Sequence, residues 1–186
     1  MKTPTRDEAF QLLREHTKNE NLIKHALSVE AAMCHYARHF GEDEALWSVV
    51  GLLHDFDYEK YPSLDDHPFK GAEILRSLGY DELLVRAILS HANHTNVPRE
   101  SRLEKTLFAV DELCGLVTAV ALVRPSKRLA DVEVKSVKKK IKDKAFARSV
   151  SRNDIREGPQ ALDIELDTHI AHVLEAMRGI SSELGL

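Results

Sequence analysis

The sequence predicts an all-α protein, and two observations support this fold class. Apolar residues recur with the helical period of about 3.6 residues along nearly the whole chain. No alternating run of apolar and polar residues is long enough for a convincing strand. The expected helices cover about residues 5–16, 19–40, 43–56, 67–78, 81–92, 101–123, 131–144 and 160–177.

Capping signals place the first three helices. Thr5 opens a segment with the spacing of a capping box, and Asn19 can cap the second helix, which Gly41 ends. The third helix carries an apolar run that closes on the pair His54-Asp55. Because an imidazole and a carboxylate are costly to bury without partners, this pair suggests a functional site.

Loop signals place the middle of the chain. Pro62 marks a loop before the fourth helix, Gly79 ends that helix, and Pro98 breaks the chain after the fifth. Residues 101–123 form a long, mostly apolar helix that we expect to be central. It should end at Arg124-Pro125, because proline disfavours helical geometry in the residue before it.

The last third of the chain is predicted to be a helical extension. Residues 131–144 place Val134, Val137 and Ile141 on one face, and residues 153–158 look like a turn region. The inward positions of the last helix are Leu162, Leu166, Ile170, Val173 and Leu174. We expect a core over residues 1–124 and an extension over residues 125–186 that packs on it, together forming one structural domain.

Composition indicates an ordinary globular protein, which we expect to be cytoplasmic. With 43% hydrophobic and 30% charged residues, disorder is not expected. The start lacks an apolar signal region, and the longest apolar segment, residues 107–123, contains Asp111 and Glu112, so no membrane association is expected. Cys34 and Cys114 are too few for a disulfide framework.

Charge is unevenly distributed along the chain. The formal net charge of −4 argues against a general nucleic-acid binder. Residues 124–148 nevertheless hold ten basic and three acidic side chains, a net charge of +7, which leaves −11 for the remainder. Arg124, Lys127 and Arg128 could line the entrance to a site after the central helix, but solvated surface charge explains them as well.

Four metal-ligand residues lie in core-like surroundings. They are His25, His54, Asp55 and Asp111, from three expected helices. Each alone fits a hydrogen-bonded core residue or a buried salt bridge, but four independent structural explanations are improbable. Two imidazoles and two carboxylates suit manganese, iron, nickel, magnesium or zinc. His67 and His91 would complete a second site if Asp55 bridges two ions, which lie about 3.5–4 Å apart in paired metal sites.

The order His25, His54-Asp55, His67, His91, Asp111 resembles the HD superfamily of metal-dependent phosphohydrolases. Residues 51–58, 67–75 and 109–113 look like the three central segments of that family, in its usual order. The resemblance implies an HD-domain helical bundle with the C-terminal extension added. The segments 123–127 and 144–148 are similar to a subgroup of small bacterial HD proteins, without indicating a substrate.

The resemblance implies the roles of the site residues. His25, His54, Asp55 and Asp111 correspond to a first metal site, with His67 and His91 as further ligands or phosphate-contacting groups. His94 is the rival to His91, and His91 matches the family position. Some single-metal relatives place a glutamate where this chain has Tyr58. Asp57 or Glu59 could substitute for it, but the resemblance does not assign them that role.

The predicted activity is hydrolysis of a phosphoester of a small metabolite or nucleotide by metal-activated water. Asp55 and His67 belong to the predicted catalytic set, as does Lys70, which lies one helical turn after His67 and could reach a phosphate; a surface lysine is the competing interpretation. One or two divalent ions are expected. A di-iron oxygenase and a non-catalytic signalling or binding module with a residual metal site remain alternatives, and oligomerisation stays open.

Overall fold

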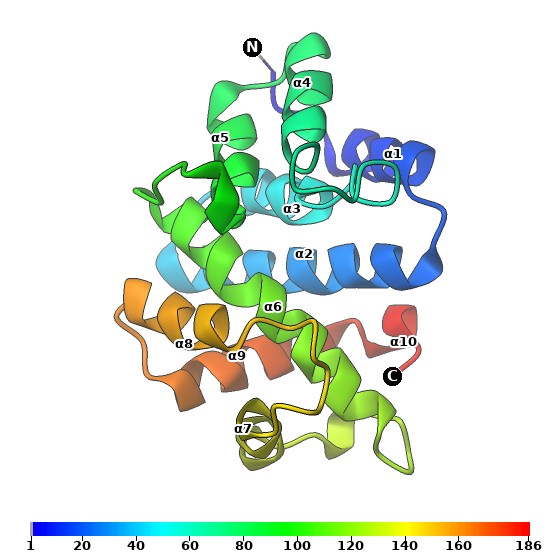
Figure 1. Cartoon of the computed structure of the whole chain (residues 1–186), viewed down its shortest axis with the longest axis vertical. Helices are drawn as coiled ribbons and strands as arrows, with labels where there is room; N and C mark the ends of the chain where they lie inside the picture. Colours follow the sequence, from blue (N-terminus) through cyan, green and yellow to red (C-terminus); the bar gives the residue numbers. More distant parts are fainter. Residues whose placement is uncertain (1) are drawn as a thin grey trace.

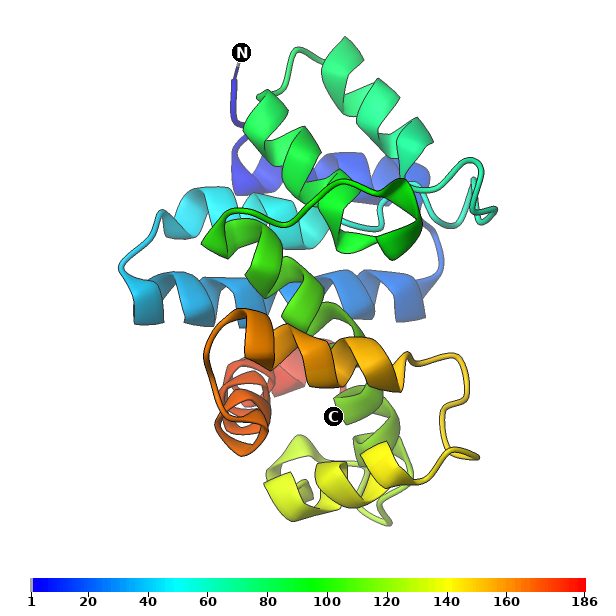
Figure 2. The same ribbon diagram turned by 60° about the vertical axis from the view of Figure 1, so that its left-hand side comes forward.

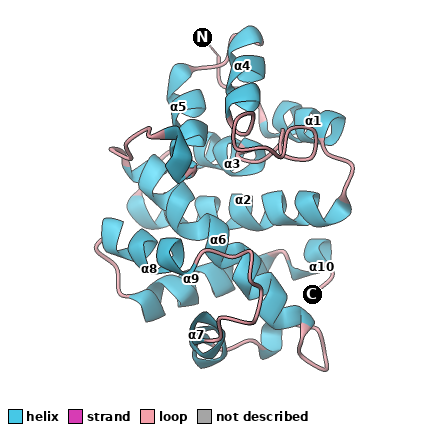
Figure 3. Cartoon of the chain, in the orientation of Figure 1, coloured by secondary structure: helices cyan, strands magenta, loops and turns pink. Residues whose placement is uncertain are grey.

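The computed structural model describes residues 2–186, a bundle arranged around two long helices (Figure 1). Helix α2 (Glu20–Phe40) and helix α6 (Arg102–Leu122) cross in the middle of the molecule. Residues 2–186 contain no named strand, and an isolated bridge joins Lys2 and Tyr80. The predicted all-α fold is confirmed (Figure 3).

One side of α2 carries the N-terminal half of the chain. Its helices are α1 (Arg6–His16), α3 (Glu44–Leu53), α4 (Phe69–Ser77) and α5 (Glu82–His91). Helix α3 packs closely against α2. Gly51 permits this approach, because a Cβ atom there would lie 2.8 Å from the Cα atom of Glu30. The end of α3 thereby brings His54 next to His25.

The other side of α2 carries the C-terminal extension (Figure 2). Its helices are α7 (Val134–Lys142), α8 (Arg152–Ala161), α9 (Leu166–Gly179) and α10 (Ser181–Leu184). Helix α9 packs against α2, and α8 packs against α6. The division into residues 1–124 and 125–186 stays a prediction, and these contacts are those expected of an extension packed on a core.

The predicted caps Thr5 and Asn19 begin their helices, and Ser101 begins α6 in the same way. Thr5 and Ser101 form capping boxes, and Asn19 accepts the backbone N–H of Asn21. Gly41 ends α2 with a φ of 71°, in the left-handed region that glycine adopts without a steric penalty. These local signals operate within a few residues, so tertiary packing does not override them.

Two predicted helices of the core are shorter than expected. The helix predicted over residues 43–56 ends at Leu53 and passes into consecutive turns. The hydroxyl of Thr17 donates to the carbonyl oxygen of Phe56 at 2.9 Å, which satisfies an acceptor that a continued helix would have used. The helix predicted from His67 begins at Phe69.

The extension differs most from the prediction. Residues 153–158, predicted as a turn, lie within α8, where Ser151 accepts the backbone N–H of Asp154 at 3.3 Å. The helix predicted over residues 160–177 is interrupted, because Asp163 adopts a φ of 55° and α9 starts only at Leu166. Leu162 consequently lies half-buried in this turn.

The remaining features of the extension follow its apolar pattern. Helix α7 is shorter than the predicted 131–144 and follows a 3₁₀ turn over Leu129–Asp131. Val137 and Ile141 are buried as expected, and Val134 is half-buried. None of the helices in residues 2–186 is long and apolar enough to cross a membrane.

Candidate metal centre

Six predicted ligands from five segments converge at one place beside α6. His25 comes from α2, His54 and Asp55 from the end of α3, His67 from the turn before α4, His91 from the end of α5, and Asp111 from α6. His25 Nε2 lies 2.9 Å from Asp111 Oδ1 and 3.3 Å from His54 Nε2. Predicted ligands that are far apart in the sequence therefore lie together in space.

Asp55 joins two groups of donor atoms. One group comprises His25, His54, Asp55 and Asp111, and the other comprises Asp55, His67 and His91; within each group the donor atoms lie within 4.8 Å of one another. Asp55 Oδ2 is 3.4 Å from His54 Nε2. Its other oxygen, Oδ1, is 3.2 Å from His67 Nε2 and 3.3 Å from His91 Nε2. This carboxylate has the geometry of a bridging ligand.

Hydrogen bonds made by the Nδ1 atoms of three imidazoles fix the orientation of the rings, and with it the direction of the lone pair on each Nε2. His54 Nδ1 donates to the carbonyl of Gly51 at 2.8 Å, and His91 Nδ1 donates to that of Ile88 at 2.5 Å. His67 Nδ1 donates to Asp57 Oδ1 at 2.8 Å. In the neutral form each ring therefore turns an unprotonated Nε2 toward Asp55.

This arrangement fits a cation. Lone pairs of imidazole nitrogens and carboxylate oxygens repel one another at these distances unless protons or a metal ion lie between them. His54 is fully buried, so protonating it without a counter-charge is costly. The mixed nitrogen and oxygen donor set suits a divalent transition metal or magnesium.

The pKa values of the histidines show the same electrostatic pull. Burial lowers the pKa of His67, but hydrogen bonds and charge from Asp55 and Asp57 outweigh burial and raise this pKa to about 9. Burial likewise lowers the pKa of His54, yet Asp55 and Asp111 raise it well above its usual value. Asp55 and Asp111 thus strongly favour positive charge at this place.

Asp57 is a positioning residue that the sequence did not single out. It is fully buried, and besides holding His67 it accepts the backbone N–H of Gly71 at 2.8 Å through Oδ2. Carboxylates that orient metal-binding histidines through the second ring nitrogen are common in metal sites. Glu59, the other acidic residue considered, instead accepts the backbone N–H groups of Lys18 and Asn19.

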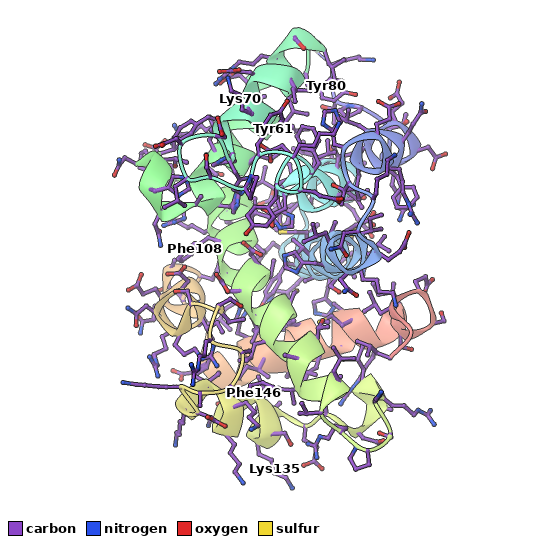
Figure 4. The ribbon with its side chains drawn as sticks, turned by 45° about the vertical axis from the view of Figure 1, so that its right-hand side comes forward. Tyr61, Lys70, Tyr80, Phe108, Lys135 and Phe146 are labelled. Carbon is purple, nitrogen blue, oxygen red and sulfur yellow. The ribbon has the colours of Figure 1, made fainter. Side chains whose placement is uncertain are left out.

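A cavity opens in front of the cluster, and the extension forms part of its wall. Phe108, labelled in Figure 4, lies on α6 at this cavity, and Ser149, Val150 and Asp154 line it from the extension. Tyr58 also lines it, with its ring edge-on to His67. The contribution of the extension depends on tertiary packing and had no signal in the sequence.

Glu112 connects the cavity wall to the core. Its Oε2 accepts the backbone N–H of Ser151 at 3.1 Å, and the residue lines the cavity. Burial raises the pKa of Glu112 to about 7, and the neighbouring charge of Asp111 adds to this effect. Glu112 therefore anchors the loop that precedes α8 rather than forming a salt bridge.

Several predicted basic contacts lie outside the cavity. Lys70, labelled in Figure 4, pairs with Glu73 at 2.9 Å and does not line the cavity, so its phosphate contact stays a prediction. Arg124 donates to the hydroxyl of Ser136, and neither Lys127 nor Arg128 lines the cavity. No lysine or arginine of the described chain therefore lines this cavity.

The other histidines have separate environments. His94 Nε2 donates to the carbonyl of His67 at 2.8 Å and stands outside both donor groups, in contrast to His91. His169 is buried between Tyr36 and the carbonyl of Ala109. His35 and His172 lie 2.8 Å apart near Glu175, where an imidazole hydrogen bond accounts for the contact.

The molecule is thus a helical bundle with a partly buried cluster of histidines and aspartates that could hold a metal ion. The HD domain profile matches residues 22–116, more than half of the chain, and the chain therefore belongs to the HD domain family. All six clustered residues, from His25 to Asp111, lie within the matched range. The predicted family is confirmed.

Two relatives show how far this similarity extends. The chain is 28% identical to ribonuclease Y of Mesoplasma florum over 118 residues, which are 61% of this chain and 21% of that protein. It is 32% identical to the uncharacterized protein MJ0778 of Methanocaldococcus jannaschii over 100 residues, which are 51% of this chain and 58% of that protein. The chain thus spans less than two thirds of either relative. No solved structure gave a significant match.

Proposed function

We propose that the protein is a metal-dependent phosphohydrolase that cleaves a phosphoester of a small metabolite or nucleotide. The observation that carries this proposal is the convergence of imidazole nitrogens on the two oxygens of Asp55. Membership of the HD domain family supports it. One relative is named a ribonuclease, which supports phosphoester chemistry, but the alignment covers too little of that protein to carry its substrate over.

We assign His25, His54, Asp55 and Asp111 to one ion, and Asp55, His67 and His91 to a second. A bound divalent ion lowers the pKa of a water molecule toward neutrality and polarises a phosphoryl oxygen. The protein contributes the fixed orientation of the ligands, because Gly51, Ile88 and Asp57 hold the outer nitrogens of three imidazoles. Tyr58 and Phe108 restrict the approach to this side of the cavity.

The test begins with metal analysis of protein purified without chelators, followed by p-nitrophenyl phosphate and bis-p-nitrophenyl phosphate as substrates with manganese or cobalt. Phosphoester hydrolysis is expected, and Asp55→Asn should reduce it by more than about 100-fold, since the loss of a residue that only orients a ligand already costs 10–100-fold. Asp163→Asn is the matched control, because Asp163 is exposed and its positive φ suits asparagine.

Two other outcomes point to the alternative functions. Bound iron with a mixed-valent spin signal, without phosphate release, would identify a di-iron oxygenase. Bound metal that stabilises the fold, without turnover of a broad panel of phosphoesters, would identify a non-catalytic binding module.

A further inference from the structure

The cavity at the metal centre is lined by carboxyl groups and by the clustered histidines rather than by lysine or arginine. Its lining in the described chain includes no lysine or arginine, while Asp55, Asp111, Glu112 and Asp154 all contribute carboxyl groups. Metal ions held by the clustered residues would compensate the charge of a phosphate at the metal centre. Any further phosphate of the same substrate is repelled from this cavity and needs cations elsewhere.

Such cations surround a second cavity, which we call the basic cavity. It lies in the extension, and its basic lining residues are Lys142, Lys144, Arg148, Arg152 and Arg156. Ile141, Val150 and Asn153 complete the lining, so that no acidic side chain contributes to it. Five cations around one hollow raise the local concentration of anions.

None of these five cations has a carboxylate partner within residues 2–186, and Arg152 bonds backbone carbonyls instead. Lys142, Lys144, Arg148 and Arg156 form no ion pair within residues 2–186, and their side chains are exposed. Other lysines of the same segment are paired: Lys135 with Glu133, Lys138 with Asp167, and Lys140 with Asp143. Lys139 of α7 is also unpaired but does not line the cavity, whereas every basic residue that lines it lacks a carboxylate partner in the described part of the chain.

Arg152 has a structural part in the same cavity. It donates to the carbonyl oxygens of Ala147 at 2.6 Å and Val150 at 2.8 Å, and also to those of Asp143 and Phe146. These bonds shape the loop between α7 and α8, and they hold Arg148 and Lys144 on this loop beside the hollow. Phe146, labelled in Figure 4, lies in the same loop.

The two cavities share a wall. Val150 lines both of them, Arg148 lines the basic cavity, and Ser149 lines the cavity of the metal centre. The same alternation recurs at the start of α8, where Asn153 faces the basic cavity and Asp154 the metal centre. The bond from the Ser151 N–H to Glu112 fixes this wall against α6.

We propose that the basic cavity is a phosphate-binding subsite and that the substrate is a small molecule carrying a second phosphate besides the one that is cleaved. Arginine and lysine side chains are well suited to phosphate oxygens. The inference rests on the proposed function, because it describes the substrate of the same site. It selects bisphosphorylated metabolites or nucleotides over monophosphates.

The test compares a nucleoside 3′,5′-bisphosphate with the corresponding 5′-monophosphate. Calorimetric titration of chelator-treated protein measures binding without turnover, and kcat/KM is measured separately with manganese. The double variant Lys144→Gln, Arg148→Gln should lower the affinity for the bisphosphate at least about tenfold, since each charge-assisted hydrogen bond contributes substantially.

The matched control is the double variant Lys135→Gln, Lys138→Gln, which removes the same charge from paired lysines that do not line the basic cavity. Lys135, labelled in Figure 4, lies at the end of the molecule away from α4. An equal loss of affinity in both variants would overturn the inference, as would equal affinity of the parent for the two nucleotides.

Two further results separate this inference from the proposed function. Tight bisphosphate binding without hydrolysis of any phosphoester would sink the proposed function and leave the subsite standing. Hydrolysis of monophosphates at a rate unaffected by a second phosphate would do the reverse. Binding of a single-stranded oligonucleotide in preference to the bisphosphate would also overturn the inference, since it would assign the basic cavity to nucleic acid.

Discussion

At the scale of single residues, hydrogen bonds on the side of the imidazoles that faces away from Asp55 orient the rings of the candidate metal centre. Three outer nitrogens have acceptors, and only the acceptor of His67 is a side chain, Asp57. The sequence predicted which histidines and aspartates cluster, because these residues and their order are visible in it. Asp57 was not predicted, since its role exists only when the turn brings His67 and Gly71 to its two oxygens.

Asp57→Asn is expected to weaken metal binding by about 10–100-fold, the usual cost of losing a residue that orients a ligand. An amide keeps the shape of the carboxylate but removes its charge, and its NH₂ group would oppose the backbone N–H of Gly71. Competition with a chromogenic chelator measures the affinity. Asp66→Asn, in the loop that precedes α4, is the control, and equal affinities in the two variants would contradict the assigned role.

At the scale of elements, two close approaches hold the bundle together: α3 against α2 at Gly51, and α8 against α6 at Gly158. Capping signals predicted the starts of α1 and α2, because a cap is a local feature. They did not predict α8, whose Gly158 and Pro159 are typical turn residues. A Cβ at position 158 would lie 2.6 Å from the Cα of Ala109, so this glycine serves helix packing, which the sequence does not show.

Gly51→Ala should destabilise the protein by about 1–3 kcal/mol, the usual cost of overpacking. The added Cβ would meet backbone atoms of Glu30, which cannot move without shifting α2. Urea unfolding measures the loss. Gly115→Ala is the control, because its nearest neighbour would be Val150 Cγ2 at 3.9 Å, an ordinary contact. Similar stabilities of the two variants would show that α3 can adjust its position freely.

His169 makes the attachment of α9 sensitive to acid. Burial lowers the pKa of His169 to about 4, below the value of 6.5 expected in the unfolded chain. The folded-state pKa is depressed, so the stabilisation is present above pH 6.5 and is lost as the pH falls toward 4. Urea midpoints should therefore decrease over this window, and His169→Gln should show a shallower decrease. Parallel curves for the two proteins would exclude His169 as the cause.

At the scale of the whole molecule, the ligands connect segments that are far apart in the sequence. Four helices and the turn before α4 contribute to the cluster, so ion binding is expected to act as a cross-link of the N-terminal half. The sequence predicted which residues meet but not the cavity they face. That cavity includes Ser149, Val150 and Asp154, whose positions depend on how the extension packs on α6.

Removal of the metal should lower Tm, and the loss should be larger at pH 9 than at pH 7. A ligand at 100 times its dissociation constant stabilises a protein by about 2.7 kcal/mol. In metal-free protein the pKa of His67 is about 9, above its unfolded value, so proton binding stabilises that form at pH 7 and ceases to do so as the pH rises through 9. Thermal unfolding with and without chelator at both pH values measures the difference, and a smaller loss at pH 9 would contradict it.

The hydrogen bond from the Ser151 N–H to Glu112 joins two parts of the sequence that contribute differently to the cavity. Every clustered ligand lies between His25 and Asp111, whereas the opposite wall lies in residues 149–154. Exchange of this short loop can therefore redirect which molecules reach Asp55 without altering a single ligand. Substrate selectivity can therefore change through substitutions in the extension while the clustered residues stay the same. This makes the loop over residues 149–154 the natural starting point for engineering a new substrate preference.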